Sequence, residues 1–323
     1  MHRISTAVTT RDLLRRLQTD ERRGAGELAS LAARYLDDLL AASGGSAWEA
    51  RLRRGTAALL ATQPAMAPLF FLANALWLGL EGPGQEAARR VAARAALARA
   101  RAVLAATAEG VARVAARLTA AARTIVTISS SSTVLAALTR LAAGHPLHVI
   151  VGEGRPALEG RRLARSAARV GCRATLVADA ALPGEVRRVD AVLLGADAVL
   201  RGSAINKVGT YPLLLAARDA AVPSYLLADG SKLVPDPLAP LIRLPVRDPR
   251  RLWRDSPPRV AVARTDFEMV PLSLLSAVVT DEGPMAPAAA ARRCAALPAA
   301  RFLRQLARRR GLRRQRRAER DRR

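Results

Sequence analysis

"DAVLLGADAVLRGSAINKVGTYPLLLAARDAAVPSYLLAD" (residues 190–229) contains the alternation that decides the fold. An apolar run ends in "GAD", a helical pattern follows in "NKVGTYPLLLAARDAA", and a second apolar run ends in "LLAD". Strands of about five residues separated by helices of ten or more residues are typical of right-handed βαβ units. This stretch therefore predicts two neighbouring strands of a parallel sheet with a helix between them.

The same alternation occurs three times upstream. The apolar runs are "TIVTIS" (124–129), "LHVIVGEG" (147–154) and "RATLVAD" (173–179). Helical patterns follow the first two runs, and a short connection follows the third. Residues 122–285 are therefore predicted to form an α/β domain with a doubly wound parallel sheet. The order of the strands is not readable from the pattern.

The flanking regions have a different texture. Residues 1–121 show apolar residues at helical spacing and predict a helical N-terminal domain. Residues 55–80 carry no charge and are long enough to span a bilayer. Pro64 and Pro68 interrupt them, which favours two shorter buried helices over a membrane span. Residues 286–323 are predicted to form a basic Ala/Arg-rich tail that is partly disordered.

The composition narrows the class of protein. The formal charge is +25, and residues 301–323 alone hold twelve arginines against two acids. Such a run is typical of a solvated end, or of a segment that binds nucleic acid. Two distant cysteines and three histidines show no metal-ligand spacing, so no metal or cofactor is expected. The N-terminus lacks the apolar core of a signal peptide, and a cytoplasmic location is expected.

Ligands of open parallel sheets bind beyond the carboxyl ends of the strands. The residues at those ends combine hydroxyls, carboxylates and cations, which suits a phosphorylated ligand. We expect the ligand-binding set to be Ser130, Ser131, Ser132, Glu153, Arg155, Asn206, Lys207 and Lys232. Asp179 and Asp229 also end strands, and the Asn206-Lys207 pair is expected to open the helix after the fourth strand.

Lysine and asparagine are rare in this chain. Among fifty-two basic residues only Lys207 and Lys232 are lysines, and Asn74 and Asn206 are the only asparagines. Arginine does not replace lysine where a compact ammonium must fit a small pocket. Both lysines fall at strand ends, so we interpret them as ligand-binding residues, with chance placement as the alternative.

Two further features allow a functional and a purely structural interpretation. The serines of 129–132 follow a strand and open a helix, where backbone N–H groups and hydroxyls can hold a phosphate. The alternative is a helix N-cap at Ser131 or Ser132. Asp197 ends an apolar strand and can act as a general acid or base if burial raises its pKa. The alternative is an N-cap of the turn at residues 201–203.

Four blocks occur in the order found in one superfamily. They are "TIVTISSSSTV" (124–134), "VGEGRPALEGRRLA" (151–164), "GADAVLRGSAINKVGTY" (195–211) and "TDFEMVPLSLLSAVVTDEG" (265–283). The chain thereby resembles, over residues 60–285, the alpha, beta and delta subunits of initiation factor 2B. The superfamily that it resembles also comprises ribose-1,5-bisphosphate isomerase and methylthioribose-1-phosphate isomerase. The resemblance implies a helical domain before a Rossmann-like domain, and assembly as a homodimer or larger homo-oligomer.

The resemblance also implies roles for individual residues. Arg155, Asn206 and Lys207 would hold the phosphate and sugar, and Asp197 matches the catalytic aspartate of the isomerases. The catalytic cysteine of those enzymes aligns with Ser129. A thiol with a pKa near 8.5 exchanges its proton near neutrality, whereas an unactivated hydroxyl does not. In this respect the serine-rich block resembles the initiation-factor subunits.

Three hypotheses for the function remain open. The first is a protein that binds a phosphorylated sugar or a nucleoside monophosphate without the usual Cys/Asp isomerase activity. The second is an aldose-ketose isomerase of a phosphorylated pentose, with Asp197 as acid/base and Ser129 only as a hydrogen-bonding group. The third is a nucleic-acid-binding or ribosome-associated protein that acts through the arginine-rich tail.

Overall fold

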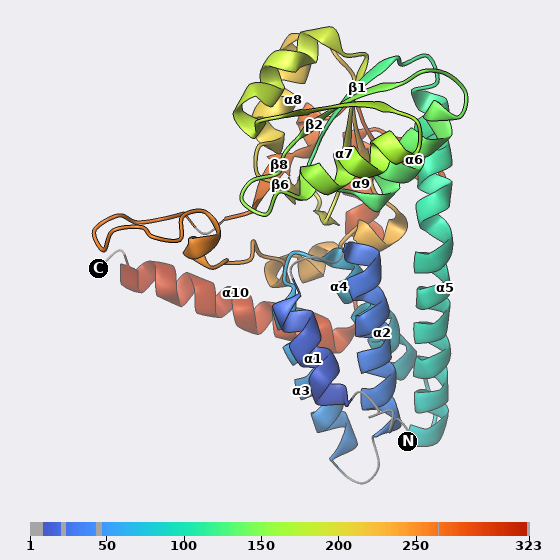
Figure 1. Cartoon of the computed structure of the whole chain (residues 1–323). Helices are drawn as coiled ribbons and strands as arrows, with labels where there is room; N and C mark the ends of the chain where they lie inside the picture. Colours follow the sequence, from blue (N-terminus) through green and yellow to red (C-terminus); the bar gives the residue numbers. More distant parts are fainter. Residues whose placement is uncertain (1–8, 21–23, 43–46, 264, 322–323) are drawn as a thin grey trace, which may run out of the picture. The chain divides into compact units, whose positions relative to one another are not determined.

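The computed structural model describes residues 9–20, 24–42, 47–263 and 265–321 (Figure 1). The chain divides into two compact units, each assembled from separate segments. The helical unit comprises Met1–Ala105, Pro237–Arg243 and Pro298–Arg323. The sheet unit comprises Ala106–Asp236 and Leu244–Leu297. The predicted boundaries at residues 121/122 and 285/286 stay predictions.

Helices build the first unit. They are α1 (Thr10–Thr19), α2 (Ala25–Ala41), α3 (Trp48–Thr62), α4 (Ala67–Leu80), the first part of α5 (Glu86–Leu118), η3 (Asp236–Leu241, from Pro237) and α10 (Arg301–Asp321). The uncharged stretch 55–80 breaks between α3 and α4, as the prolines predicted. The buried Gln63 side chain in this break donates to the Leu17 carbonyl at 2.9 Å. None of the described helices has the length and apolarity that a membrane span requires.

A seven-stranded sheet forms the centre of the second unit. Its order is β10-β9-β7-β4-β1-β2-β3, and every neighbouring pair is parallel except β9 and β10. The strands are β1 (Thr124–Ile128), β2 (His148–Gly152), β3 (Arg173–Val177), β4 (Ala191–Gly195), β7 (Ser224–Leu227), β9 (Ala277–Thr280) and β10 (Gly283–Met285). The predicted helical region followed by a Rossmann-like, mostly parallel sheet is confirmed.

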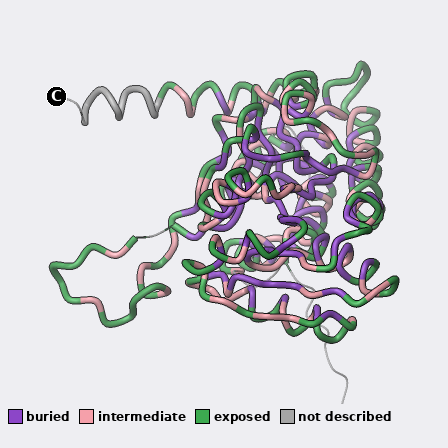
Figure 2. Tube along the Cα trace, turned by 90° about the horizontal axis from the view of Figure 1, so that it is seen from above, coloured by how far each residue is buried: buried purple, intermediate pink, exposed green. Residues whose placement is uncertain are grey.

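Helices of this unit connect the strands and bury them. They are α6 (Ser132–Ala142), α7 (Glu159–Arg169), α8 (Thr210–Asp219), α9 (Pro287–Ala296), the end of α5, and the short helices η1 (Asp179–Arg188), η2 (Gly230–Lys232), η4 (Pro249–Arg251) and η5 (Leu272–Leu274). Strand β4 is buried along its whole length, as expected for a strand covered on both faces. Figure 2 marks the buried positions along the chain. Helix α9 contributes Ala290 and Cys294 to the core, although the sequence placed it in a tail.

A second, three-stranded antiparallel sheet corrects one detail of the sequence analysis. It consists of β5 (Ala198–Val199), β6 (Ser203–Lys207) and β8 (Phe267–Pro271). Asn206 and Lys207 therefore end a strand and do not open a helix. Helix α8 begins only at Thr210, because Gly209 has a left-handed φ of 100° that an α-helix does not accept.

The strand order fixes where a ligand can bind. From β1 the chain adds β2 and β3 on one side, and then β4, β7 and β9 on the other. The order therefore reverses between β1 and β4. In open α/β sheets the crevice beyond the carboxyl ends of two such strands is the usual ligand site. The loops after Ile128 and Gly195 border this crevice.

Candidate functional site

The loops after β1 and β4 touch each other. A Cβ atom at Gly195 would lie 2.7 Å from both the Cβ and the Oγ of Ser131. This is too close for any side chain, so the backbone of the "GAD" block can approach the serine loop only because residue 195 is glycine. The approach brings Ser131 next to the segment that ends in Asp197.

Asp197 is half-buried just beyond β4. Burial raises the pKa of its carboxyl group to about 6, against the opposing effect of the Lys232 and Lys207 ammonium groups. The Glu159 carboxylate raises this pKa further, and Arg247 lowers it. A carboxyl group with a pKa near 6 can accept and release a proton close to neutrality, which is the property of a general acid or base.

Lys207 is the most deeply buried cation of this cluster, with 1% of the residue exposed. Its Nζ lies 3.1 Å from Oε1 and 3.0 Å from Oε2 of Glu159, the first residue of α7. The same ammonium lies 5.9 Å from the centre of the Phe267 ring on β8. A buried ammonium requires such partners, because desolvation without them is very costly.

Asn206 precedes Lys207 on β6 and is also buried. Its side-chain Nδ2 has no hydrogen-bond partner among the described residues. A buried amide donor without a partner is rare, since it forfeits the hydrogen bonds it would make in water. The amide can donate a hydrogen bond to a polar group from outside the protein, and ligand binding by Asn206 and Lys207 stays a prediction.

Lys232 reaches the cluster from the segment after β7. It ends the short helix η2 and is buried. Asp229 caps this helix by accepting a hydrogen bond from the Ser231 N–H at 2.9 Å. Asp229 thus has a structural role in holding the turn. Among the cations, Lys232 has the largest lowering effect on the pKa of the Asp197 carboxyl group.

The four predicted serines have different environments. Ser129 has a φ of 66°, an uncommon conformation for a residue other than glycine. Ser131 is the N-cap of α6 and accepts from the Val134 N–H at 3.3 Å, which is the structural alternative that the sequence offered. Ser130 is half-buried, and Ser132 is exposed at the first position of the helix. Ser131 therefore has a structural role as a cap, and ligand binding by Ser130, Ser131 and Ser132 stays a prediction.

Glu153 and Arg155 lie on the loop after β2 and have partners outside the lysine cluster. The Glu153 carboxylate forms an ion pair with Arg161 of α7 at 3.1 Å. The exposed Arg155 donates from Nη2 to the Leu252 carbonyl at 3.4 Å. Asp179 holds the loop by accepting from the Gly154 and Arg155 backbone N–H groups at 2.8 and 2.7 Å. Ligand binding by Glu153 and Arg155 stays a prediction.

The strand-end argument missed Glu159 and Arg247. Glu159 opens a helix, and Arg247 belongs to an irregular segment between η3 and β8. The guanidinium carbon of Arg247 lies 6.0 Å from the same Phe267 ring as Lys207. The signal for Glu159 was present in the sequence, because it belongs to the block "VGEGRPALEGRRLA" (151–164). No local signal marks Arg247, which only tertiary folding brings near Asp197.

Neither cysteine of this chain can substitute for the catalytic thiol that the isomerases have at the position of Ser129. Cys172 precedes β3, at the edge of the sheet opposite the crevice, and burial raises its pKa. Burial likewise raises the pKa of Cys294 to about 11, and its Sγ lies 3.5 Å from the Val199 carbonyl. Both thiols are therefore protonated and unreactive near neutrality. In the described ranges, His, Cys, Asp and Glu side chains form no cluster of three or more that could hold a metal ion.

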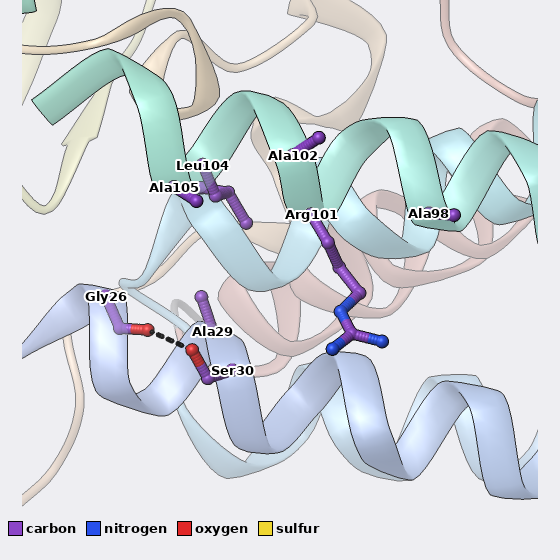
Figure 3. A pocket seen from close by; sticks show the side chains of 8 residues that line it. All are labelled: Gly26, Ala29, Ser30, Ala98, Arg101, Ala102, Leu104 and Ala105. Atoms are coloured by element: carbon purple, nitrogen blue, oxygen red, sulfur yellow. Dashed lines mark hydrogen bonds between the residues drawn. The ribbon is translucent and has the colours of Figure 1, made fainter.

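One hollow in the helical unit has a different chemistry. Figure 3 shows this hollow between α2 and α5, with a volume of about 480 Å³. Its lining consists mainly of alanines, and its one charged side chain, Arg101, is paired with Asp37 at 3.0 Å. The residues that line this hollow include no acid, whereas an acid and three cations act on Asp197. The crevice of the sheet unit is therefore the candidate site.

Curated relatives match a part of this chain. A methylthioribose-1-phosphate isomerase of Chloroflexus aurantiacus is 33% identical over 159 residues, 46% of each chain. A ribose 1,5-bisphosphate isomerase of Archaeoglobus fulgidus is 30% identical over 169 residues, 51% of this chain and 54% of its own. The chain thus matches about half the length of these curated relatives.

A solved structure and a family model extend over most of the chain. The translation initiation factor eIF-2B of Pyrococcus horikoshii OT3 has a TM-score of 0.75 and 25% identity, covering 86% of this chain and 97% of that one. The model of the initiation factor 2 subunit family matches residues 6–287. This match spans both units, and it agrees with the resemblance of the four sequence blocks. The chain belongs to the initiation factor 2 subunit family.

Proposed function

We propose that this protein binds a phosphorylated sugar or a nucleoside monophosphate in the crevice of the sheet unit, without the usual Cys/Asp isomerase activity. The observation that carries the proposal is the buried Asn206 amide, which has no partner among the described residues and precedes the buried Lys207 on β6. An amide N–H donates to a hydroxyl or phosphate oxygen, and the Lys207 ammonium would add the charge that a phosphate requires.

The placement of these groups supports a small polar ligand. They surround the point where the strand order reverses, which is the usual ligand site of this architecture. Lys232, Lys207 and Arg247 all lower the pKa of the Asp197 carboxyl group, so three cations lie close enough to act on one site. The isomerases to which the chain is similar are named for phosphorylated sugars. Both lines favour a phosphate-bearing ligand.

The absence of a thiol supports binding without the usual catalysis. Ser129 occupies the position that the family resemblance gives to the catalytic cysteine. A serine hydroxyl needs a neighbouring base to exchange a proton near neutrality. The nearest histidines in sequence are His145, which precedes β2, and His148, the first residue of β2. Both lie at the opposite end of the strands from Ser129. Of the catalytic cysteine and aspartate of the isomerases, this chain would then keep only the aspartate, as Asp197.

A second candidate function rests on Asp197 itself. Its pKa of about 6 suits proton transfer during isomerisation of a phosphorylated pentose. In that case Ser129 would only donate or accept a hydrogen bond to the sugar. The expected homo-oligomer and the expected cytoplasmic location stay predictions under either function.

The test is a phosphorus and proton NMR time course with the full chain. Ribose 1,5-bisphosphate, methylthioribose 1-phosphate and adenosine monophosphate are added in separate tubes. Broadening of the ligand signals without new products, lost in Lys207→Met, is expected. Arg218→Gln, an exposed substitution on α8 with the same change of charge, is the matched control and should bind normally.

Two results would change the conclusion. New ketose signals that disappear in Asp197→Asn would establish the isomerase and refute loss of catalysis. Equal binding by the wild type and Lys207→Met would show that the site itself is misassigned. The melting temperature of each variant, measured by thermal denaturation, shows whether it is folded. A normal melting temperature excludes misfolding as the cause of lost binding.

A further inference from the structure

Helix α10 carries a charge pattern that the crevice does not explain. Ten of its twenty-one residues are arginines, and its first acid is Glu319. The helix begins inside the helical unit, where the Phe302 ring lies 4.4 Å from the Trp77 ring and Leu303 is buried. It is thus an anchored element, and Figure 1 shows it extending away from the other helices of its unit toward its C-terminal end.

The first half of α10 presents arginines on one side. Arg301, Arg304 and Arg308 are exposed and follow one another at i, i+3 and i+7, so they share a helix face. Arg309 is exposed beside them. In the described part of the chain, Arg304, Arg308 and Arg309 form no ion pair with a carboxylate. This face, defined by Arg301, Arg304, Arg308 and Arg309, is the α10 basic face.

The sequence of the second half excludes a membrane-surface helix. After Leu312 it reads "RRQRRAERD" (313–321), in which Ala318 is the single apolar residue. A helix that lies in a lipid interface needs a continuous apolar face opposite its charges. The buried apolar positions of α10, Leu303 and Ala307, already pack within the protein. The helix therefore suits a partner that offers charge and no apolar surface.

We propose that the α10 basic face and the arginines that follow it bind the phosphate backbone of a nucleic acid, independently of its sequence. Guanidinium groups bind phosphate oxygens through two parallel N–H donors. A helix of this length spans about 30 Å, enough to contact several phosphates. Residues 301–323 carry a net +10, against +15 for the other three hundred residues, so the charge is concentrated here.

The test measures the anisotropy of a labelled twenty-nucleotide oligo-U RNA and of a DNA duplex of similar length, at several salt concentrations. The variant is Arg304→Gln/Arg308→Gln/Arg309→Gln in the full chain, because glutamine retains helix propensity. Each lost phosphate contact should reduce the log–log salt slope for single strands by about 0.7, so a decrease of about 2 is expected. The affinity at low salt should fall by about tenfold or more.

A matched control separates a dedicated surface from general basicity. Arg94→Gln/Arg99→Gln/Arg165→Gln removes three exposed arginines from α5 and α7, with the same change of charge. It should bind within about twofold of the wild type. Equal losses in both variants would refute the proposal, because the whole surface would then be responsible.

A truncation and a lipid arm complete the design. Ending the chain after Gly311 removes seven arginines and two acids and keeps the packed Phe302, Leu303 and Ala307. It should weaken RNA binding without changing the melting temperature. Arginine-dependent binding to phosphatidylserine vesicles, with no binding to RNA or DNA, would overturn the proposal in favour of a lipid partner. Comparison of the RNA and the duplex shows which phosphate backbone is preferred.

Discussion

The Nζ of Lys207 lies 3.0 Å from Oε2 of Glu159, and the lysine is only 1% exposed. The carboxylate offsets the cost of burying the ammonium, as the desolvation of an unpaired charge requires. The Glu159 carboxylate also pairs with the Lys207 ammonium, which is the group that a phosphate would bind. A phosphate that enters the crevice must therefore share Lys207 with Glu159 or displace it.

Glu159→Gln should separate these two effects. Without ligand, the variant should lose about 2–4 kcal/mol of unfolding free energy, because Lys207 keeps its charge and loses its partner. With phosphate, the relative gain in stability should exceed that of the wild type, since the anion no longer competes with a carboxylate. Thermal denaturation with and without 20 mM phosphate measures both quantities. An equal phosphate response in the two proteins would contradict competition at Lys207.

Asn206→Leu tests whether the unpaired amide serves a ligand. Replacing a buried polar group that lacks partners by an apolar group of similar size should leave stability unchanged or raise it by about 1 kcal/mol. The same substitution should abolish stabilisation by a sugar phosphate. Chemical denaturation in the absence and presence of ligand provides both measurements. If the variant is strongly destabilised without ligand, the amide has an internal role and this interpretation is wrong.

The sequence predicted the fold well because its signals are local. Each of the five strands expected in residues 122–285 is a short apolar run bounded by turn residues, and all five are found in the sheet. The antiparallel β5-β6-β8 sheet was missed, since "SAINK" (203–207) pairs with Phe267–Pro271, about sixty residues away. No local sequence pattern near either strand predicts this pairing.

The candidate site was predictable from the sequence only in part. The strand ends pointed to Asp197, because a parallel sheet brings its carboxyl ends together. Rarity pointed to Asn206 and Lys207, although these lie on the antiparallel strand β6 and not at the start of a helix. Which side chains actually meet depends on the paths of the loops, so the sequence analysis singled out neither Arg247 nor Glu159. The mutual contact of Lys207 and Glu159 requires tertiary structure, since forty-eight residues separate them.

Asp197 should make stability depend on pH. Its pKa of about 6 exceeds that of an unfolded aspartate, so the folded state binds more protons between these values. The protonated Asp197 carboxyl group therefore adds to the unfolding free energy. This contribution is fully present below about pH 4 and is lost as the pH rises through 6. Relative to Asp197→Asn, the wild type should lose about 1 kcal/mol of unfolding free energy between pH 5 and pH 8. Urea titrations of both proteins at these pH values measure the difference, and a difference independent of pH would show that the pKa is not raised.

Gly195 and Ser131 should behave as a coupled pair. Gly195→Ala places a Cβ 2.7 Å from the Ser131 side chain, and such overpacking typically costs about 1–3 kcal/mol. Ser131→Gly removes the N-cap hydroxyl of α6, for which glycine is a fair substitute, so it should cost only a few tenths of a kcal/mol. The double variant should recover most of the loss, because the added methyl group then occupies the vacated space. A double-mutant cycle of unfolding free energies measures this coupling. Additive losses would mean that the loops after β1 and β4 do not meet at these residues, and the placement of the serine loop beside Asp197 would then be wrong.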